Sequence, residues 1–253
     1  MVEIKNLSAG YNGQPVIRIP SLSFGEGEIT SIIGENGSGK STLLKTIDNI
    51  LRYNGSIKAN GKEIAGLRHL ERARLVAYLP QTLIPVRLNV RTLVSHGRYA
   101  HTGISHRLSS VDRTMVDNAM VLTDVQDMRD RWLNEISGGE LKRCYLAMVI
   151  AQNSRYILLD EPAAGLDVSH QIMMMTILRR LAGEGIGIII TSHDTPLSLT
   201  YSDRVCMLKN GEVLAVQRPE EIEAEDAMMR KCIGYGIKIN GDESALYKYR
   251  LEK

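Results

Sequence analysis

A phosphate-binding loop is the clearest chemical feature of the sequence. Residues 34–42 read GENGSGKST, and they fit the pattern G-x-x-x-x-G-K-[ST] up to Ser41. An apolar run at 29–33 precedes the loop and a helical pattern follows it, which is the context that this motif requires. The backbone N–H groups of such a loop, together with the N-terminus of the helix, bind phosphate oxygens. We therefore expect a nucleotide site here.

The residue types within this loop suggest individual contacts. Lys40 is expected to reach the terminal phosphates, the Ser41 hydroxyl to ligate Mg²⁺, and Thr42 to contact phosphate. The glycines allow the backbone to curl around the phosphate oxygens. The predicted ATP-binding residues of the loop are Gly34, Glu35, Asn36, Gly37, Ser38, Gly39, Lys40, Ser41 and Thr42.

Two adjacent carboxylates form the second candidate group. The strand pattern at 156–160 ends in Asp160, and Glu161 and Pro162 follow it. The tip of such a strand places Asp160 beside a Mg²⁺ ion, while Glu161 orients the attacking water and accepts its proton. An ordinary strand that ends in an acidic turn has the same pattern. The pair therefore indicates a catalytic site only in combination with the phosphate loop.

The third element is the segment ISGGE, which opens a helical pattern. A serine hydroxyl and glycine N–H groups at a helix N-terminus form a second phosphate cradle, although a simple serine cap is the alternative. The segment resembles the LSGGQ signature of ATP-binding-cassette (ABC) ATPases, with Ile136 in place of Leu and Glu140 in place of Gln. The resemblance implies a head-to-tail dimer in which Ser137, Gly138, Gly139 and Glu140 contact an ATP held by the other copy.

Three single residues resemble further elements of ABC ATPases, and they occur in the family's order. Gln81 resembles the glutamine that touches Mg²⁺ or the water, and His193 resembles the switch histidine that contacts the γ-phosphate. Tyr11 matches the aromatic residue that stacks on adenine. Taken alone, they are a turn residue, a strand-end histidine and a turn or core aromatic. Residues 164–167 resemble the loop where the two subunits meet.

Strands and helices must alternate along the chain to position these groups. Alternation of this kind predicts a mostly parallel sheet with helices on its faces. Asp112 or Ser110 is expected to cap a helix that continues to about residue 122. Strand patterns occur at 2–7, 16–19, 29–33, 56–59, 75–79, 156–160, 186–191 and 205–208, and helical patterns at 41–51, 93–151, 168–181 and 197–200.

The resemblance to ABC ATPases implies an α/β fold of defined layout. It consists of a P-loop NTPase (RecA-like) core, an N-terminal antiparallel β region and a helical subdomain inserted at about 86–152. We expect this ABC ATPase domain to cover residues 1–218. A small C-terminal appendage is expected at 219–253, with a hairpin pattern around Asn240-Gly241.

Composition narrows the classes of partner and the location. The net charge is +2, from 31 basic and 29 acidic residues, so no nucleic-acid partner is expected. Three widely spaced cysteines argue against a disulfide framework or a zinc site. The longest aliphatic stretch is far shorter than the roughly 20 residues that span a bilayer, and the N-terminus alternates as a strand rather than as a signal peptide. We expect a peripheral protein on the cytoplasmic face of the cell membrane, held there by another protein.

A segment in the helical part resembles one importer branch of the family. Residues 90–99 read VRTLVSHGRY, as in relatives that serve uptake of iron–siderophore complexes, haem and cobalamin. The resemblance implies an ATPase subunit that dimerises around two ATP with Mg²⁺, drives a transmembrane permease and is served indirectly by a substrate-binding protein. The alternatives are the ATPase of another ABC transporter, either a metal-ion importer or an exporter, and a soluble ATP-gated switch. The single cassette without sustained heptads favours a transporter subunit.

Overall fold

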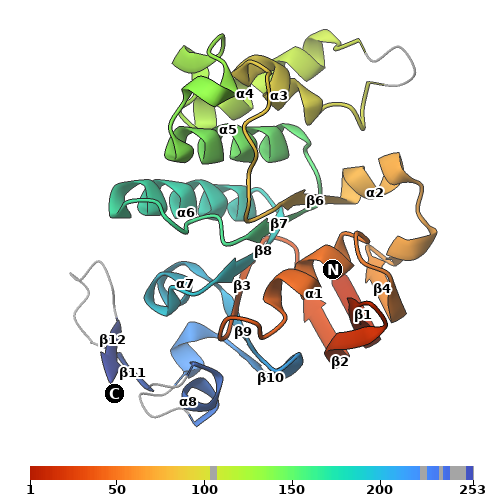
Figure 1. Ribbon diagram of the computed structural model, residues 1–253, viewed down its shortest axis with the longest axis vertical. Helices are drawn as coiled ribbons and strands as arrows, with labels where there is room; N and C mark the ends of the chain where they lie inside the picture. The colour runs from red at the N-terminus through yellow and green to blue at the C-terminus, as the bar shows by residue number, and fades with distance from the viewer. Residues whose placement is uncertain (103–106, 223–226, 234–235, 240–248, 253) are drawn as a thin grey trace.

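The computed structural model describes residues 1–102, 107–222, 227–233, 236–239 and 249–252, which form two large β-sheets and a helical region (Figure 1). In the central sheet the strand order is β10-β9-β3-β8-β7-β6, and neighbouring strands from β9 to β6 run parallel. β10 pairs antiparallel with β9 at one edge. The bounds are β3 (Ile29–Ile33), β6 (Val76–Leu79), β7 (Tyr156–Asp160), β8 (Gly187–Ser192), β9 (Arg204–Lys209) and β10 (Glu212–Gln217).

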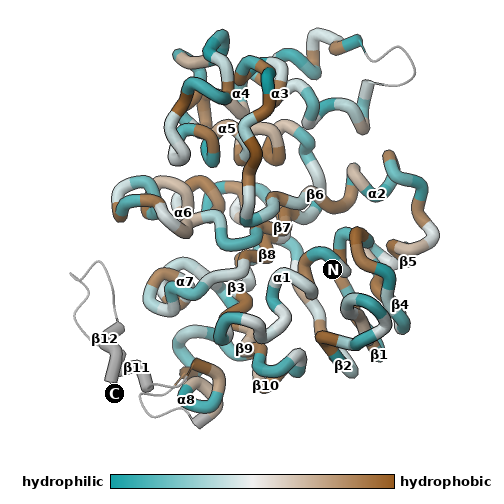
Figure 2. Tube along the Cα trace, viewed as in Figure 1, coloured by the Kyte–Doolittle hydropathy of each residue, from teal (hydrophilic) through white to brown (hydrophobic). Residues whose placement is uncertain are grey.

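Three inner strands of this sheet are buried along their whole length. Every residue of β3, β7 and β8 is buried, as expected for parallel strands that are covered on both faces. Figure 2 shows hydrophobic colouring along these central strands. Because parallel strands end at the same edge of a sheet, the segments that follow β3, β6, β7 and β8 come together there.

An antiparallel sheet covers one face of the central sheet, with α1 (Lys40–Ile47) between them (Figure 1). Its strand order is β2-β1-β4-β5. One apolar core joins this sheet to α1 and the central strands, with Ile4, Ile17, Leu43 and Leu158 among its members. The bounds are β1 (Val2–Tyr11), β2 (Gln14–Phe24), β4 (Tyr53–Ala59) and β5 (Lys62–Glu63).

The opposite face of the central sheet is covered by α6 (Val168–Gly183) and α7 (Thr195–Tyr201). A separate helical region follows β6 and contains α3 (Val90–His96), α4 (Ser110–Leu122) and α5 (Gly138–Ala151). These three helices pack around their own apolar core. α3 and α5 approach closely, because a Cβ on Gly97 would lie 2.2 Å from the carbonyl oxygen of Met148. Short 3₁₀ turns lie at Ile64–Gly66, Gln126–Met128, Leu133–Glu135 and Pro219–Glu221.

The predicted fold class is confirmed, and several local predictions need correction. Neither Asp112 nor Ser110 is the N-cap of α4. That place belongs to Ser109, whose backbone is extended and whose hydroxyl accepts the N–H of Asp112. The predicted helix at 41–51 ends at Ile47, and Asn49 beyond it has a left-handed backbone with φ 58°. A helix that the patterns did not predict, α2 (His69–Leu75), precedes β6.

The C-terminal part contains α8 (Ala227–Ile233) and the antiparallel pair β11 (Gly236–Ile239) and β12 (Tyr249–Glu252). The pairing agrees with the predicted hairpin, whose Asn240-Gly241 turn lies outside the described residues. α8 packs on the central sheet, because Met229 and Cys232 share a buried cluster with Ile33 and Met207. The domain boundary at 218 stays a prediction. Within the described residues, no helix is both long and apolar enough to cross a membrane.

Candidate nucleotide site at the carboxyl edge of the central sheet

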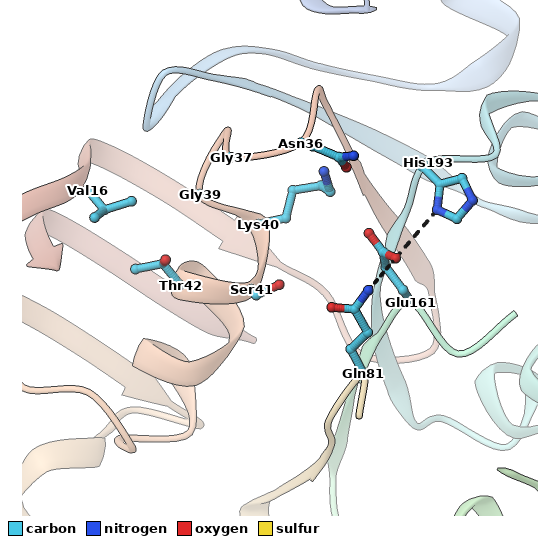
Figure 3. Close-up of a pocket in the computed structure, with 10 residues that line it drawn as sticks. All are labelled: Val16, Asn36, Gly37, Gly39, Lys40, Ser41, Thr42, Gln81, Glu161 and His193. Atoms are coloured by element: carbon cyan, nitrogen blue, oxygen red, sulfur yellow. Dashed lines mark hydrogen bonds and ion pairs between the residues drawn. The ribbon is translucent and has the colours of Figure 1, made fainter. Parts of the chain in front are cut away.

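The predicted phosphate loop connects β3 to α1 and lines a pocket. Two of its glycines are required by close contacts: a Cβ on Gly34 would lie 2.1 Å from Leu208 O, and one on Gly39 would lie 2.5 Å from Ile17 Cγ2. Gly39 also has φ 105, which residues with a Cβ rarely adopt. We call the volume of about 540 Å³ in front of the loop the phosphate-loop pocket (Figure 3). It is lined by Val16, Asn36, Gly37, Gly39, Lys40, Ser41, Thr42, Gln81, Glu161 and His193.

Lys40 is held inside the loop by backbone oxygens. Its Nζ donates to the carbonyl of Gly34 at 2.8 Å and to that of Glu35 at 3.0 Å. Burial lowers the pKa of this lysine, while the nearby carboxylates Glu161 and Asp160 oppose the shift. A strong donor that is satisfied only by loop carbonyls can turn to a phosphate oxygen when one enters the pocket.

Asp160 ends β7 and accepts hydrogen bonds from three neighbouring elements. Ser41 Oγ donates to Oδ1 at 2.9 Å, Thr191 Oγ1 donates to the same oxygen at 2.7 Å, and the Tyr78 hydroxyl donates to Oδ2 at 3.2 Å. The carboxylate is buried, with 2% of the residue exposed. Burial, followed by the charge of Asp160, raises the pKa of Tyr78, so its hydroxyl remains a donor. The arrangement fixes the carboxylate beside the first turn of α1.

Glu161 lies where the ends of three strands meet. Its Oε2 accepts a hydrogen bond of 2.8 Å from Gln81 Nε2, and His193 Nδ1 lies 3.5 Å from the same oxygen (Figure 3). Gln81 follows β6, Glu161 follows β7 and His193 follows β8. The order β8-β7-β6 in the sheet therefore brings together three residues that are far apart in sequence.

The chemistry of the pocket fits a nucleotide with a hard divalent cation. Ser38 Oγ is buried and finds no hydrogen-bond partner within the described part of the chain, so it is free to bind a phosphate oxygen. Gly37 lines the pocket, and a Cβ on it would meet no atom within 4 Å, so the loop is not crowded at this residue. The hydroxyl of Ser41 and the carboxylate of Asp160, 2.9 Å apart, are oxygen ligands of the kind that Mg²⁺ prefers.

The segment 137–140 forms the N-terminus of α5 in the helical region, outside the phosphate-loop pocket (Figure 1). Ser137 Oγ accepts from the N–H of Glu140 at 3.3 Å, and Glu140 Oε2 accepts from the N–H of Ser137 at 2.7 Å. This is a capping box, so the simple structural role of the serine is present. Lys142, one turn on, donates to the carbonyl of Ala164 and so ties α5 to the loop after β7.

Comparison with known proteins decides the family. The sequence model described as "ABC transporter" matches residues 17–164. The chain belongs to the ABC transporter family. A petrobactin import ATP-binding protein of Bacillus subtilis (strain 168) is 38% identical over 225 residues, which cover 88% of each chain. A hemin import ATP-binding protein of Chelativorans sp. (strain BNC1) is 34% identical and covers 94% of this chain and 93% of its own.

Solved structures of ABC cassettes have the same fold. A cassette from Clostridium perfringens, part of an ABC transporter complex, has 30% identity and a TM-score of 0.77, with 91% of this chain and 93% of that chain covered. An inward-facing, putative metal-chelate type ABC transporter has a TM-score of 0.82 at 20% identity, which shows the fold alone. It covers 100% of this chain and 97% of its own. The chain is an ATP-binding ABC ATPase.

In this ABC ATPase the pocket contains most of the residues predicted from the loop, together with Gln81, Glu161 and His193. Tyr11 does not line it: this residue ends β1 and is 43% exposed. Sequence reasoning missed Val16, which lines the pocket, and the two donors to Asp160, Tyr78 and Thr191. The only sequence signal for the donors is a hydroxyl near the end of a buried strand, which is a common pattern.

Proposed function

We propose that the chain is the ATP-hydrolysing subunit of an ABC importer for an iron–siderophore complex, haem or cobalamin. The observation that carries the catalytic part is the junction at Glu161, where one carboxylate oxygen contacts both Gln81 and His193 at the edge of the phosphate-loop pocket. The import branch is supported by relatives named for petrobactin, hemin and siderophore transport, which match over 82–93% of their own lengths.

The phosphate loop binds the nucleotide in this proposal. Lys40 exchanges the carbonyls of Gly34 and Glu35 for the terminal phosphates. The backbone N–H groups of the loop and Ser38 Oγ donate to the remaining phosphate oxygens. Ser41 and Asp160, with Gln81 nearby, would hold Mg²⁺. When bound, this ion neutralises charge on the phosphates. Tyr11 is proposed to stack on adenine.

Glu161 is proposed as the general base. Its carboxylate orients a water molecule next to the γ-phosphate and accepts a proton as the water oxygen bonds to the γ-phosphorus. The bond from that phosphorus to the bridging oxygen breaks, so that ADP leaves. Gln81 restrains the carboxylate by the 2.8 Å hydrogen bond. His193, whose side chain is 59% exposed, faces the pocket and would contact the γ-phosphate. Proton acceptance and phosphate contact thus come from adjacent strand ends.

A second copy of the chain is proposed to complete the site. The cradle at 137–140 lies in the helical region, away from the chain's own pocket, so it is placed to cap an ATP bound by another copy. Two ATP would then lie between the two head-to-tail copies. The capping box satisfies the N–H groups of Ser137 and Glu140, and those of Gly138 and Gly139, in the first turn between them, can bind phosphate.

The membrane partner is proposed to contact the surface that follows Gln81. Ile84, Val86 and Tyr99 expose 68%, 39% and 48% of their area, and apolar exposure of this kind is typical of interaction sites. Ile84 is tied to α5 through its carbonyl, which accepts from the Tyr145 hydroxyl at 2.8 Å. The chain would thus be peripheral on the cytoplasmic face of the membrane. A substrate-binding protein would contact the permease and would be only an indirect partner of this chain.

Growth of a deletion strain tests the importer assignment. Loss of growth on an iron–siderophore complex, haem or cobalamin, restored by the wild-type gene and not by Glu161→Gln, is the expected result. A deletion strain that uses all three sources normally would contradict the import branch. Affinity purification from detergent-solubilised membranes should recover a many-helix permease, whereas a preparation without any membrane protein favours the soluble switch.

A further inference from the structure

We propose that Thr191 is a positioning residue for ATP hydrolysis, because one buried hydroxyl holds both Asp160 and Glu161. The inference rests on the roles proposed above for these two carboxylates. Thr191 lies on β8, is 0% exposed, and pairs in register with Asp160 on β7. Its place next to the two acidic residues is therefore fixed by the hydrogen bonding of the sheet rather than by a loop.

The Thr191 hydroxyl uses its donor and an acceptor position at once. Oγ1 donates to Asp160 Oδ1 at 2.7 Å and accepts the backbone N–H of Glu161 at 2.9 Å. A hydroxyl has one hydrogen and two lone pairs, so both bonds form together. The side chain thus connects the residue proposed to hold Mg²⁺ with the residue proposed to activate water.

The second of these bonds matters because the backbone of Glu161 is in an unfavourable conformation. Its φ is 49°, in the left-handed region that residues with a Cβ rarely adopt. Such a conformation persists only where surrounding contacts enforce it. The N–H accepted by Thr191 is one such contact at the residue itself. The turn it stabilises brings the carboxylate of Glu161 to Gln81 and His193 (Figure 3).

The hydrogen bond from Thr191 to Asp160 comes from a different part of the fold than the other contacts of Asp160. Ser41 belongs to the phosphate-binding helix and is itself proposed to contact the metal ion, so its hydrogen bond is part of nucleotide binding. Tyr78 reaches the other carboxylate oxygen. Thr191 comes from the core of the sheet, so its bond to Oδ1 is independent of the state of the loop. We infer that it orients Asp160 before the nucleotide enters.

Thr191→Val tests this role, because valine keeps the shape of threonine and removes the hydroxyl. We expect kcat to fall by about tenfold or more, since small displacements of catalytic groups have effects of this size. The Mg²⁺ concentration for half-maximal activity should rise severalfold. Binding of a fluorescent ATP analogue in EDTA should stay within about twofold of wild type, because the phosphate loop makes its contacts without Thr191. Thr191→Ser should restore kcat to within about threefold.

Thr30→Val is a matched control. Thr30 lies on the neighbouring strand β3 and is 2% exposed, and its Oγ1 has no hydrogen-bond partner among the residues that the structure describes. The same atoms are replaced in the same sheet, but no bond to a carboxylate is lost. We expect wild-type kcat and Mg²⁺ dependence for Thr30→Val. Thr191→Ala provides a second, smaller variant in case valine impairs folding, and it should share the kinetic pattern of Thr191→Val.

Two results would overturn the positioning role. One is a folded Thr191→Val or Thr191→Ala enzyme with wild-type kcat and Mg²⁺ dependence. The other is an equal loss of kcat in Thr30→Val, which would indicate a packing effect. Failure of the proposed base is separate, because it would appear as wild-type turnover in Glu161→Gln whatever the Thr191 variants do.

Discussion

Lys209 and Glu35 connect the phosphate loop to the C-terminal helix. Lys209 Nζ lies 3.5 Å from Glu35 Oε1 and also donates a hydrogen bond of 2.6 Å to the carbonyl oxygen of Lys231 in α8. The Cys232 thiol contacts the carbonyl oxygen of Ile33, the last residue of β3, at 3.6 Å. α8 is therefore connected to the phosphate loop through Lys209 and to the end of β3 through Cys232.

Loss of this connection should reduce the affinity for ATP more than it reduces the stability of the folded protein. Lys209→Met removes the ion pair with Glu35, and exposed pairs contribute about 0.2–1 kcal/mol. We expect the Kd for ATP, measured by isothermal titration calorimetry, to rise about two- to fivefold. Arg180→Met is the control, because it removes an exposed ion pair with Glu184 on α6, outside the phosphate-loop pocket. Equal ATP affinities in the two variants would contradict the supporting role of Lys209.

Glu161→Gln should separate nucleotide binding from hydrolysis. The amide keeps the size of the carboxylate but cannot accept the proton of water, so kcat should fall by about 10²–10⁴. ATP should still bind and should produce a dimer on size-exclusion chromatography. Lys40→Met serves as the contrasting variant, since it should lose ATP affinity itself. Wild-type turnover in Glu161→Gln would exclude Glu161 as the base.

Ser137→Ala should abolish hydrolysis through the partner's site. The substitution also removes an N-cap, which costs about 1 kcal/mol. Ser109→Ala corrects for this loss, because Ser109 forms the corresponding capping box at α4, outside the phosphate-loop pocket. We expect a decrease in Tm for both variants, larger for Ser109→Ala because Ser109 Oγ also donates to Asp112, and a loss of ATPase activity only for Ser137→Ala.

Mixing two inactive variants tests the head-to-tail arrangement directly. Ser137→Ala keeps an intact phosphate loop, and Lys40→Met keeps an intact cradle at 137–140. A mixed dimer contains one complete site if each loop is capped by the other copy. Recovery of up to about a quarter of the wild-type activity is expected for random mixing. No recovery in dimers shown to be mixed would argue against the arrangement.

Acid stability should depend on the buried pair of Asp112 and Arg98. Their closest atoms are 2.9 Å apart and both side chains are at most 8% exposed. Hydrogen bonds from Ser109, with the Arg98 contact, lower the pKa of Asp112 to about 2 from its usual 3.8. Because the folded-state pKa is the lower one, the stabilisation of about 2 kcal/mol is present above pH 4 and disappears as the pH falls towards 2.

Urea unfolding at pH 5 and pH 2.5 measures this contribution. Asp112→Asn should be less stable than wild type at pH 5 by about 3 kcal/mol, because Arg98 remains buried without its partner. It should also lose less stability between the two pH values than wild type does. Asp130→Asn is the control, since the side chain of Asp130 is 81% exposed. An unchanged pH dependence in Asp112→Asn would contradict the assignment.

Local sequence patterns were enough to predict the elements that depend on residues close together in the chain. The phosphate loop, the strand that ends in Asp160 and the capped segment at 137–140 each depend on contacts within a few residues. Buried strands such as β3 and β8 were predictable because parallel strands covered on both faces need continuous apolar runs. α2 was not predictable, because none of its described side chains is buried and its apolar residues show no helical period.

The sequence by itself determined that this protein binds and hydrolyses ATP. In each motif, the residues that contact phosphate lie within a few positions of one another and can be recognised without the fold. Only the tertiary structure decided which residues share an oxygen of Glu161, and that Thr191 joins Asp160 to Glu161. It also decided that α8 packs against the end of β3, where the phosphate loop begins. The physical reason is the strand order, which makes neighbours of segments that no local spacing relates.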